Sequence, residues 1–211
     1  MGHFSSDMTL ATAPIYEEKQ LVIVSPTSTS VAISKAGNYI FRTVPSDRFT
    51  SSALAEYFLE QLKLRKVAVI YNSKSAYSSS LQEIFTTDII SNGGEIVAEI
   101  DLSDNNFNPA ETLKSLQAQG AEALALLNDS QTIDKAYLLI QLNERKLPLL
   151  AGDSLYKPQT LEIGGAKAQG LVVSVPWHVG SANTDFPSVA RSLWEEMSTG
   201  VLQWLMMPPK L

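Results

Sequence analysis

Short apolar runs alternate with amphipathic stretches through the middle of the chain. Residues 67–71 are rich in strand-forming side chains and predict a buried strand. Between the strands, apolar residues recur at helical spacing, as Leu81, Ile84 and Phe85 do. Further strands are predicted at residues 95–102, 123–127, 147–150 and 169–175. Strands separated by helices indicate βαβ units, so we expect an α/β fold with a Rossmann-like parallel sheet sandwiched by helices.

The first part of the chain has a different pattern. A helix is predicted from about Asp7 to Glu18, with strands near 21–24 and 38–44. Because one helix and two strands are too few to enclose a core, we expect this segment to pack on the larger unit or to be a remnant of a second lobe. The predicted organisation is a partial first lobe and crossover at 1–47, a complete second lobe at 48–176, and a return segment to the first lobe at 177–211.

Composition excludes several classes of function. Of the 211 residues, 45% are hydrophobic and 18% are charged, which is typical of a folded domain. The net charge of -6, with no basic stripe, argues against nucleic-acid binding. Because the chain has no cysteine, disulfides, cysteine-based zinc sites and thiol catalysis are excluded. No apolar run reaches the ~18 residues of a membrane helix, and we find no signal peptide at the start of this chain.

Ligands of open α/β sheets bind beyond the carboxyl ends of the strands, which directs attention to the strand-to-helix loops. These loops are polar and rich in hydroxyl groups, and none contains a phosphate-binding glycine motif. No serine elbow or triad is present, so we expect no catalytic residue and no cofactor. The two histidines, His3 and His178, lie far apart without carboxylates at ligand spacing, so we expect no metal site.

Ser5, Ser6 and Asp7 precede the first predicted helix. Their side chains suit helix capping, because serine and aspartate oxygens accept hydrogen bonds from the free amides of the first turn. The same amides would attract a carboxylate or another anion. Capping is the interpretation that the residues favour, and an anion site stays open.

Two further residues invite a choice between structure and function. Asp153 directly follows a predicted strand, where a carboxylate serves either as a turn cap or as the counter-ion of an ammonium group. Tyr77 could give a ligand apolar contact and one hydroxyl, or could simply pack at the surface.

A series of segments resembles, in order and spacing, the leucine/isoleucine/valine-binding family of periplasmic binding proteins of type I. These segments are Gly2–Ser6, Ala13–Tyr16, Ser25–Thr29, Phe41–Asp47, Val67–Tyr71 with Tyr77, and Leu150–Ser154. The resemblance covers residues 2 to about 194. It implies that two α/β lobes close on a small amino-acid-like ligand.

The resemblance also implies roles for individual residues. Ser6, Thr27 and Thr29 match the groups that bind the ligand carboxylate in this family. Asp153 matches the acidic residue that binds the ammonium group, and Tyr77 matches an aromatic residue that covers the ligand. The family's second aromatic, expected at 128–130, has no counterpart here, which leaves a more polar amino acid or an amide open.

The family implies a protein that is not an enzyme and that works in the periplasm or outside the cell. Its expected partner is the membrane permease of an ABC transporter, with a signalling module as the alternative. A truncated product without a working site and a nucleotide-dependent enzyme are competing interpretations. No nucleic-acid partner is expected.

Both ends of this chain depart from the family pattern. About half a lobe is absent ahead of Gly2, and we expect the incomplete lobe to expose sheet edges that favour self-association. The match stops after Trp194, and the tail at 195–211 can be back-translated in a shifted reading frame into a family-like string. We therefore expect a frameshift near residue 195.

Overall fold

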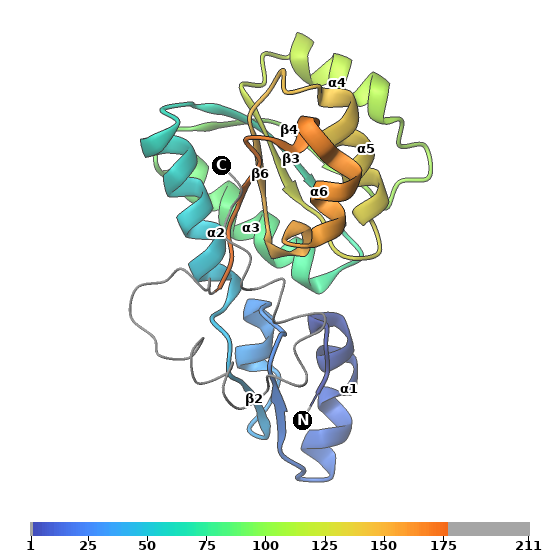
Figure 1. Ribbon diagram of the computed structural model, residues 1–211. Coiled ribbons are helices and arrows are strands. Elements are labelled where there is room, and N and C mark those ends of the chain that lie inside the picture. The colour runs from blue at the N-terminus through green and yellow to red at the C-terminus, as the bar shows by residue number, and fades with distance from the viewer. Residues whose placement is uncertain (1, 177–211) are drawn as a thin grey trace, which may run out of the picture. The chain divides into compact units, whose positions relative to one another are not determined.

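A parallel sheet of five strands organises most of the chain in the computed structural model, which describes residues 2–176 (Figure 1). The strands are β3 (Lys66–Tyr71), β4 (Glu95–Asp101), β5 (Ala123–Leu127), β6 (Leu149–Ala151) and β7 (Val172–Val173). Their order across the sheet is β4-β3-β5-β6-β7, and every neighbouring pair is parallel. The α/β fold with a parallel sheet between helices is thus confirmed.

Helices cover both faces of this sheet, which explains why the central strands are continuously apolar. Alternate residues of β3 enter different cores: Ala68 and Ile70 face one side, and Val67 and Val69 face the other. The first core is closed by α4 (Pro109–Ala118) and α5 (Ile133–Asn143), and Figure 1 shows α6 (Pro158–Gly164) on the same side. The second core is closed by α2 (Asp47–Glu56), its π-helical continuation η2 (Tyr57–Gln61) and α3 (Ala76–Ser91).

The N-terminal segment contains α1 (Ser6–Glu18), β1 (Ile23–Ser25), the 3-10 turn η1 (Val31–Lys35) and β2 (Ile40–Arg42). The strands β1 and β2 form a parallel pair of their own. Four buried residues make its small core: Ala13, Ile23, Ile33 and Ile40. Such a core is marginal, so contacts with the larger sheet matter.

Hydrogen bonds join this segment to the part of the chain that contains the five-stranded sheet. The carboxylate of Asp7 accepts from the backbone amide of Ala76, at 2.6 Å, and from the hydroxyl of Ser75, at 3.1 Å. The amide of Val31 donates to the hydroxyl oxygen of Ser80, at 3.2 Å. Residues 2–174 accordingly lie within one compact unit.

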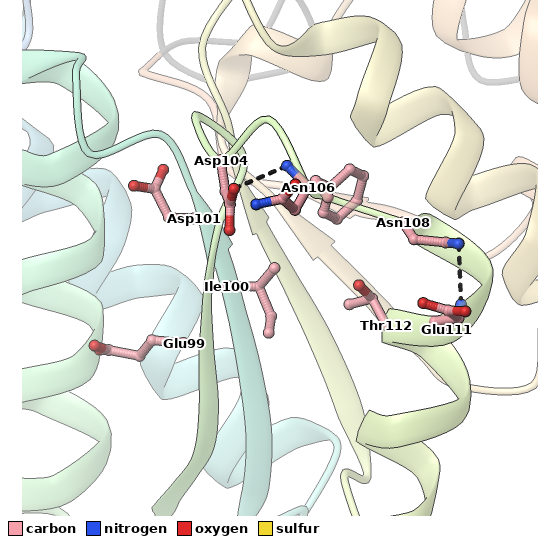
Figure 2. Close-up of a pocket in the computed structure, with 9 residues that line it drawn as sticks. Glu99, Ile100, Asp101, Asp104, Asn106, Asn108, Glu111 and Thr112 are labelled. Carbon is pink, nitrogen blue, oxygen red and sulfur yellow. Dashed lines mark hydrogen bonds between the residues drawn. The ribbon is translucent and has the colours of Figure 1, made fainter.

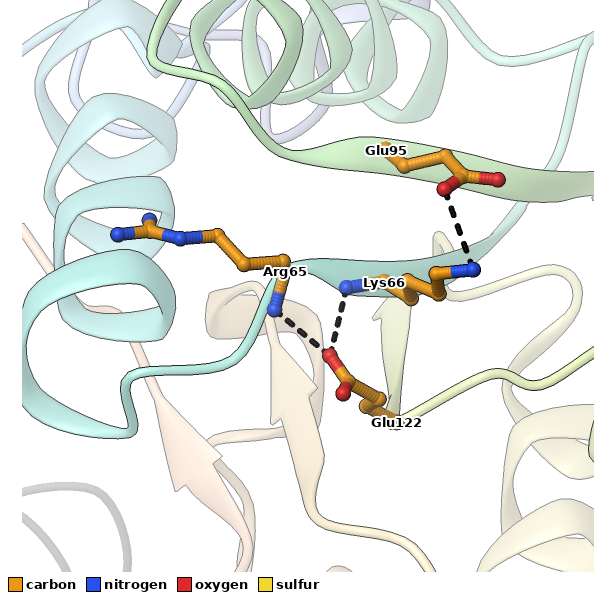
Figure 3. Close-up of polar contacts among 4 residues, drawn as sticks. All are labelled: Arg65, Lys66, Glu95 and Glu122. Atoms are coloured by element: carbon orange, nitrogen blue, oxygen red, sulfur yellow. Dashed lines mark hydrogen bonds and ion pairs between the residues drawn. The ribbon is translucent and has the colours of Figure 1, made fainter.

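The amino edge of the five-stranded sheet is closed by a carboxylate (Figure 3). Glu122, just before β5, accepts from the amides of Arg65 at 2.7 Å and Lys66 at 2.8 Å. These two hydrogen bonds lower the pKa of Glu122. Lys66 in turn forms an ion pair with Glu95, at 3.4 Å. The Glu122 carboxylate and the Lys66 ammonium group therefore both have partners at this edge.

Several predicted boundaries were wrong by one to three residues. The first helix begins at Ser6, because the side chain of Ser5 is the N-cap and accepts from the amide of Met8. Strand β1 starts two residues later than predicted, since Leu21 and Val22 are exposed. The short turns η3 (Asp153–Leu155) and η4 (Gly165–Ala168) flank α6 and were not predicted.

The helical stretch formed by α2 and η2 was also not predicted. The proposed lobe boundary after residue 47 stays a prediction. The return segment at 177–211 and its unusual tail lie outside the described residues.

Candidate functional site

Tyr77 and Asp153 meet at the carboxyl edge of the sheet. Asp153 opens η3 directly after β6, and Tyr77 lies in the first turn of α3. The Tyr77 hydroxyl donates a hydrogen bond to the Asp153 carboxylate. Gly152 permits this approach, because a Cβ there would lie 2.8 Å from the Tyr77 hydroxyl oxygen and 2.8 Å from Leu81. The hydrogen bond uses one oxygen of the Asp153 carboxylate.

Burial governs the electrostatics of this pair. It raises the pKa of Asp153, although the Tyr77 hydroxyl and Lys157 act in the opposite direction. Burial also raises the pKa of Tyr77 well above its usual value, with further increases from the charges of Asp153 and Asp47. Tyr77 is therefore a neutral hydrogen-bond donor, and an ionised Asp153 needs a cation to offset its loss of water.

The loop that follows β1 presents a row of hydroxyl groups. Ser25 donates to Ser28 at 2.8 Å, and Ser28 shares a hydrogen bond with Thr9 of α1 at 2.8 Å. Thr29 is buried, and its carbonyl accepts from the amide of Asp47 at 2.8 Å and from Arg42 at 3.2 Å. These bonds tie the loop to α1, β2 and the start of α2.

The hydroxyl-bearing residues predicted for the ligand carboxylate lie in different surroundings. Ser6 is buried in the first turn of α1, where its hydroxyl oxygen accepts from the amide of Ser30 at 3.1 Å. Thr27 is exposed, and its hydroxyl donates to the carbonyl of Phe4 at 2.5 Å. Thr29 is buried, and its side chain lowers the pKa of Asp47 at the start of α2.

Asp47 is the residue that sequence reasoning missed as a site candidate. It is the first residue of α2 and has no exposed surface. Its pKa is raised to about 6, because burial and, to a smaller extent, the charge of Asp153 outweigh the lowering by Ser80, Thr29 and Arg42. The hydroxyls of Ser80 and Thr29 lie close enough to Asp47 to lower its pKa. Neither carboxylate oxygen of Asp47, however, forms a hydrogen bond of good geometry within residues 2–176. The sequence shows the aspartate and the helix start, and only the tertiary fold shows its burial.

Asn128 and Asp129 occupy the loop after β5. The amide nitrogen of Asn72, after β3, donates to the carboxylate of Asp129 at 3.1 Å and bridges the point where the strand order reverses. The side chain of Asn128 is fully buried and its oxygen has no partner among the described residues. Its backbone carbonyl accepts from the hydroxyl of Ser154 at 2.7 Å, beside Asp153.

A separate acidic pocket of about 300 Å³ lies beside the loop after β4 (Figure 2). Asp101 and Asp104 in its lining accept hydrogen bonds from neighbouring residues of the protein. Hydrogen bonds from Ser73 and Ser103 outweigh partial burial and lower the pKa of Asp101 to about 2, while Asp104 accepts from the amide of Asn106 at 2.8 Å. These contacts stabilise the loop and leave no buried orphan atom in this pocket.

The described part of the chain offers neither a metal site nor a membrane span. Within residues 2–176 no three His, Asp or Glu side chains gather where an ion could be held. Among the same residues, no helix has the length and apolar character needed to cross a membrane.

Thr29, Tyr77 and Asp153 therefore gather around Asp47, where a loop of the N-terminal segment meets the carboxyl edge of the larger sheet. Ser6 is bonded to the amide of Ser30, the residue after Thr29. Thr27 lies on the exposed side of the loop. This group combines hydroxyls from one segment with a carboxylate and a tyrosine from the other, which is the combination of groups expected for a protein of the class that binds a polar solute.

Comparison with known proteins agrees with that class. The profile of the periplasmic binding protein family matches residues 1–192, so the chain belongs to this family, whose members are solute-binding proteins and not enzymes. A Leu/Ile/Val-binding protein homolog from Brucella melitensis is 27% identical over 178 residues, which are 82% of this chain and 47% of that protein.

Two solved structures share the fold. A leucine-binding protein from Thermotoga maritima has a TM-score of 0.78 at 24% identity and covers 93% of this chain and 56% of its own. An ABC transporter substrate-binding protein from Desulfitobacterium hafniense, in complex with Leu, has a TM-score of 0.76 at 22% identity, with coverages of 97% and 58%. The chain spans about half the length of the curated relatives it matches.

Proposed function

We propose that this chain is part of an extracytoplasmic solute-binding protein that binds an amino-acid-like zwitterion. The observation that carries the proposal is the pairing of Tyr77 with the partly buried Asp153, while Thr29 of the hydroxyl-rich loop and Asp153 both act on Asp47. A zwitterion needs an anionic group for its ammonium and hydrogen-bond donors for its carboxylate, and the candidate residues offer both kinds of group.

The ammonium group is assigned to Asp153. Tyr77 occupies one carboxylate oxygen and holds the side chain in place, so the other oxygen serves the ligand. Burial makes the isolated anion costly, and a ligand ammonium would offset that cost.

The ligand carboxylate is assigned to Ser6, Thr27 and Thr29. Support comes from their place at the start of α1 and in the loop after β1, where hydroxyls and helix amides favour an anion. Thr29 is the strongest of the three candidates, because it is buried beside the ammonium end of the site. Thr27 would have to give up its bond to Phe4 to take part.

The relatives support a place for this protein in transport. Their names describe Leu/Ile/Val-binding proteins and ABC transporter substrate-binding proteins. We therefore assign the chain to the periplasm or the cell exterior, with an ABC permease as its partner.

Calorimetric titration of the full chain with the twenty common amino acids tests the function. We expect heat of binding from leucine or from a polar amino acid, and none from 4-methylpentanoate, which is leucine without its amine. Circular dichroism of the same sample verifies that the chain is folded. Silence across the whole panel from a folded sample would sink the proposal and favour a product without a working site.

A further inference from the structure

The turn that ends α3 contains the only Asn-Gly pair of the sequence, Asn92-Gly93. Asn92 is the C-cap of the helix, and Gly93 follows with a φ of +79°, a left-handed conformation that glycine adopts without strain. Both residues are exposed. A Cβ added at Gly93 would meet no atom within 4 Å, so this glycine has open space beside it. The pair is therefore accessible to water and sterically unhindered.

An asparagine that precedes a glycine is more reactive than other asparagines. The backbone nitrogen of the next residue can attack the side-chain carbonyl carbon of asparagine, because this attack closes a five-membered ring. A side chain on the next residue hinders the approach, and glycine has none. Every other asparagine of the sequence is followed by a residue that carries a side chain. Asn92 therefore has the least hindered route to this reaction.

Two hydrogen bonds hold the pair in place. The side-chain nitrogen of Asn92 donates to the carbonyl of Asp88 at 2.8 Å, and the amide of Gly93 donates to the carbonyl of Ile90 at 3.2 Å. Both bonds must open before the Asn92 side chain can turn toward the Gly93 nitrogen. Helix ends fray, so opening at this exposed terminus costs much less than global unfolding.

Burial and hydrogen bonding protect asparagines elsewhere in the fold. The side-chain nitrogen of Asn72 donates to Asp129 at 3.1 Å, and its oxygen accepts from the amide of Lys74 at 3.0 Å. Asn143 is bonded through both side-chain atoms to the backbone of Leu147, at 2.8 and 3.2 Å. Both asparagines are buried. Neither side chain can turn toward the following nitrogen without breaking bonds in the protein interior.

The end of α4 provides a matched comparison. Gln119 is the C-cap of that helix, and Gly120 follows with a φ of +80°. The amide of Gly120 donates to the carbonyl of Gln117 at 3.1 Å, as that of Gly93 does to Ile90. The two turns therefore share their backbone arrangement and differ in the length of the capping side chain. The longer glutamine would have to close a less favourable six-membered ring.

We propose that Asn92 is a site of spontaneous deamidation in the folded protein. The Gly93 nitrogen loses its proton and bonds to Cγ of Asn92, the bond from Cγ to the side-chain nitrogen breaks, and ammonia leaves with that proton. Water then opens the succinimide ring at either of its carbonyls. The product is aspartate or isoaspartate, in which the backbone passes through the former side chain. One water is consumed and one ammonia released, without oxidation, and the inference does not depend on the proposed function.

The surroundings of Asn92 make the product carboxylate unfavourable. Asn92 lines a hollow of about 310 Å³ with three carboxylate side chains, Glu56, Glu60 and Asp88, and no basic side chain of the described chain lines it. A carboxylate at position 92 would lose the bond to the Asp88 carbonyl and would face these like charges. It would also lie at the negative end of the helix dipole and four residues from Asp88.

Isoaspartate would disturb the packing as well as the charge. It lengthens the backbone by one carbon shortly before Gly94, where a Cβ would already lie 2.7 Å from Ile89 and 3.2 Å from Leu59. Both neighbours belong to the core that α2, η2 and α3 close against the sheet. A displacement of Gly94 would therefore be transmitted to this core.

Ageing of the full chain tests the proposal. The folded protein is incubated at pH 7 and at pH 8.5 and is then cleaved after glutamate. Three peptides separate the sites: 84–95 with Asn92 alone, 100–111 with three exposed asparagines, and 112–122 with Gln119. Mass spectrometry measures the converted fraction of each peptide, and chromatography separates aspartate from isoaspartate.

We expect peptide 84–95 to convert several-fold faster than the other two. The rate should rise with pH, because the Gly93 nitrogen must lose its proton, and should rise further in urea, because the bonds of the helix end then open. Asn92→Gln should nearly abolish the conversion of this peptide, and Asn106→Gln should leave it unchanged. Conversion of 84–95 in the folded chain at or below the rate of 100–111 would overturn the proposal.

Asn92→Asp reproduces the charge of the product without the additional backbone carbon. We expect it to lower the equilibrium constant for folding by about two- to fivefold, as measured by urea denaturation. Gln119→Glu places the same charge at the C-cap of α4 and should cost less, because Gln119 is not part of the acidic hollow. Equal losses from the two variants would overturn the destabilising effect assigned to the hollow.

Discussion

The two edges of the five-stranded sheet treat their carboxylates in opposite ways. At the amino edge, Glu122 is exposed, accepts two backbone amides and has a lowered pKa. Near the carboxyl edge, Asp47 is buried, Asp153 is partly buried, and loss of hydration raises the pKa of both. Hydrogen bonds to the charged form and burial of the charged form are opposing influences, and each edge is dominated by one of them. The carboxylate of Glu122 at the amino edge has its hydrogen-bond partners within the protein, whereas that of Asp47 near the carboxyl edge has none of good geometry among the described residues.

The largest effect should come from Asp153→Asn. Removing one partner of a buried charge pair costs about 3 kcal/mol, or roughly a hundredfold in affinity for the ligand that binds best. Calorimetry checks the loss, with Asp134→Asn as the exposed control. Equal ligand affinity of the parent and Asp153→Asn would show that Asp153 at the carboxyl edge does not bind the ligand.

Asp47→Asn should stabilise the ligand-free chain above pH 6. Because the pKa of Asp47 is about 6 when folded and 3.8 ordinarily, its contribution favours folding below pH 3.8 and is lost as the pH rises through 6. The shift corresponds to at most about 3 kcal/mol, which the amide would not lose. Urea denaturation at pH 4 and pH 7.5 measures the difference. A variant as pH-dependent as the parent would show that Asp47 is not the group responsible.

Tyr77→Phe should weaken ligand binding about tenfold, since it removes the hydroxyl that holds Asp153 and costs on the order of 1 kcal/mol. Gly152→Ala tests the same contact differently, because its Cβ would displace that hydroxyl without removing it. Both variants should reduce affinity with little change in the urea midpoint. An effect from Tyr77→Phe alone would indicate that the hydroxyl tolerates displacement.

Glu122→Gln should have the smallest effect. The group is exposed, so weakening its hydrogen bonds to Arg65 and Lys66 costs less than about 1 kcal/mol. Ligand affinity should not change, and parallel urea and calorimetric measurements check both points. A loss of affinity would mean that the two edges are coupled through the strands.

Much of the fold could be predicted from the sequence because its parallel sheet is covered on both faces. Such strands are continuously apolar, as residues 67–71 and 123–127 are, and their pattern is visible without any partner. The short strands were predicted too long, because the ends of β1 and β7 are limited by pairing and not by hydrophobicity. The assignment of Tyr77 and Asp153 to a ligand stays a prediction, although the fold places them in contact.

Asp47 illustrates what sequence reasoning could not supply. Its position after Pro45 and Ser46 indicates a helix start, where aspartate is usually exposed. Its burial depends on Thr29, Ser80 and Tyr77, which approach it only through the packing of separate elements. The local pattern does not separate this aspartate from Asp134, which also lies in the first turn of its helix, α5, and is exposed.

The bond between Asn72 and Asp129 spans the crevice where doubly wound folds commonly hold a nucleotide. A phosphate entering there would have to break this bond and meet the negative charge of Asp129. The crevice is thus filled by the side chains of Asn72 and Asp129. The buried acceptors without partners in the described chain, the oxygens of Asp47 and of the Asn128 side chain, lie elsewhere, near β6 and the loop after β1. A solute bound there would contact both the N-terminal segment and the part that contains the five-stranded sheet. Its binding would therefore hold these two parts of the chain together.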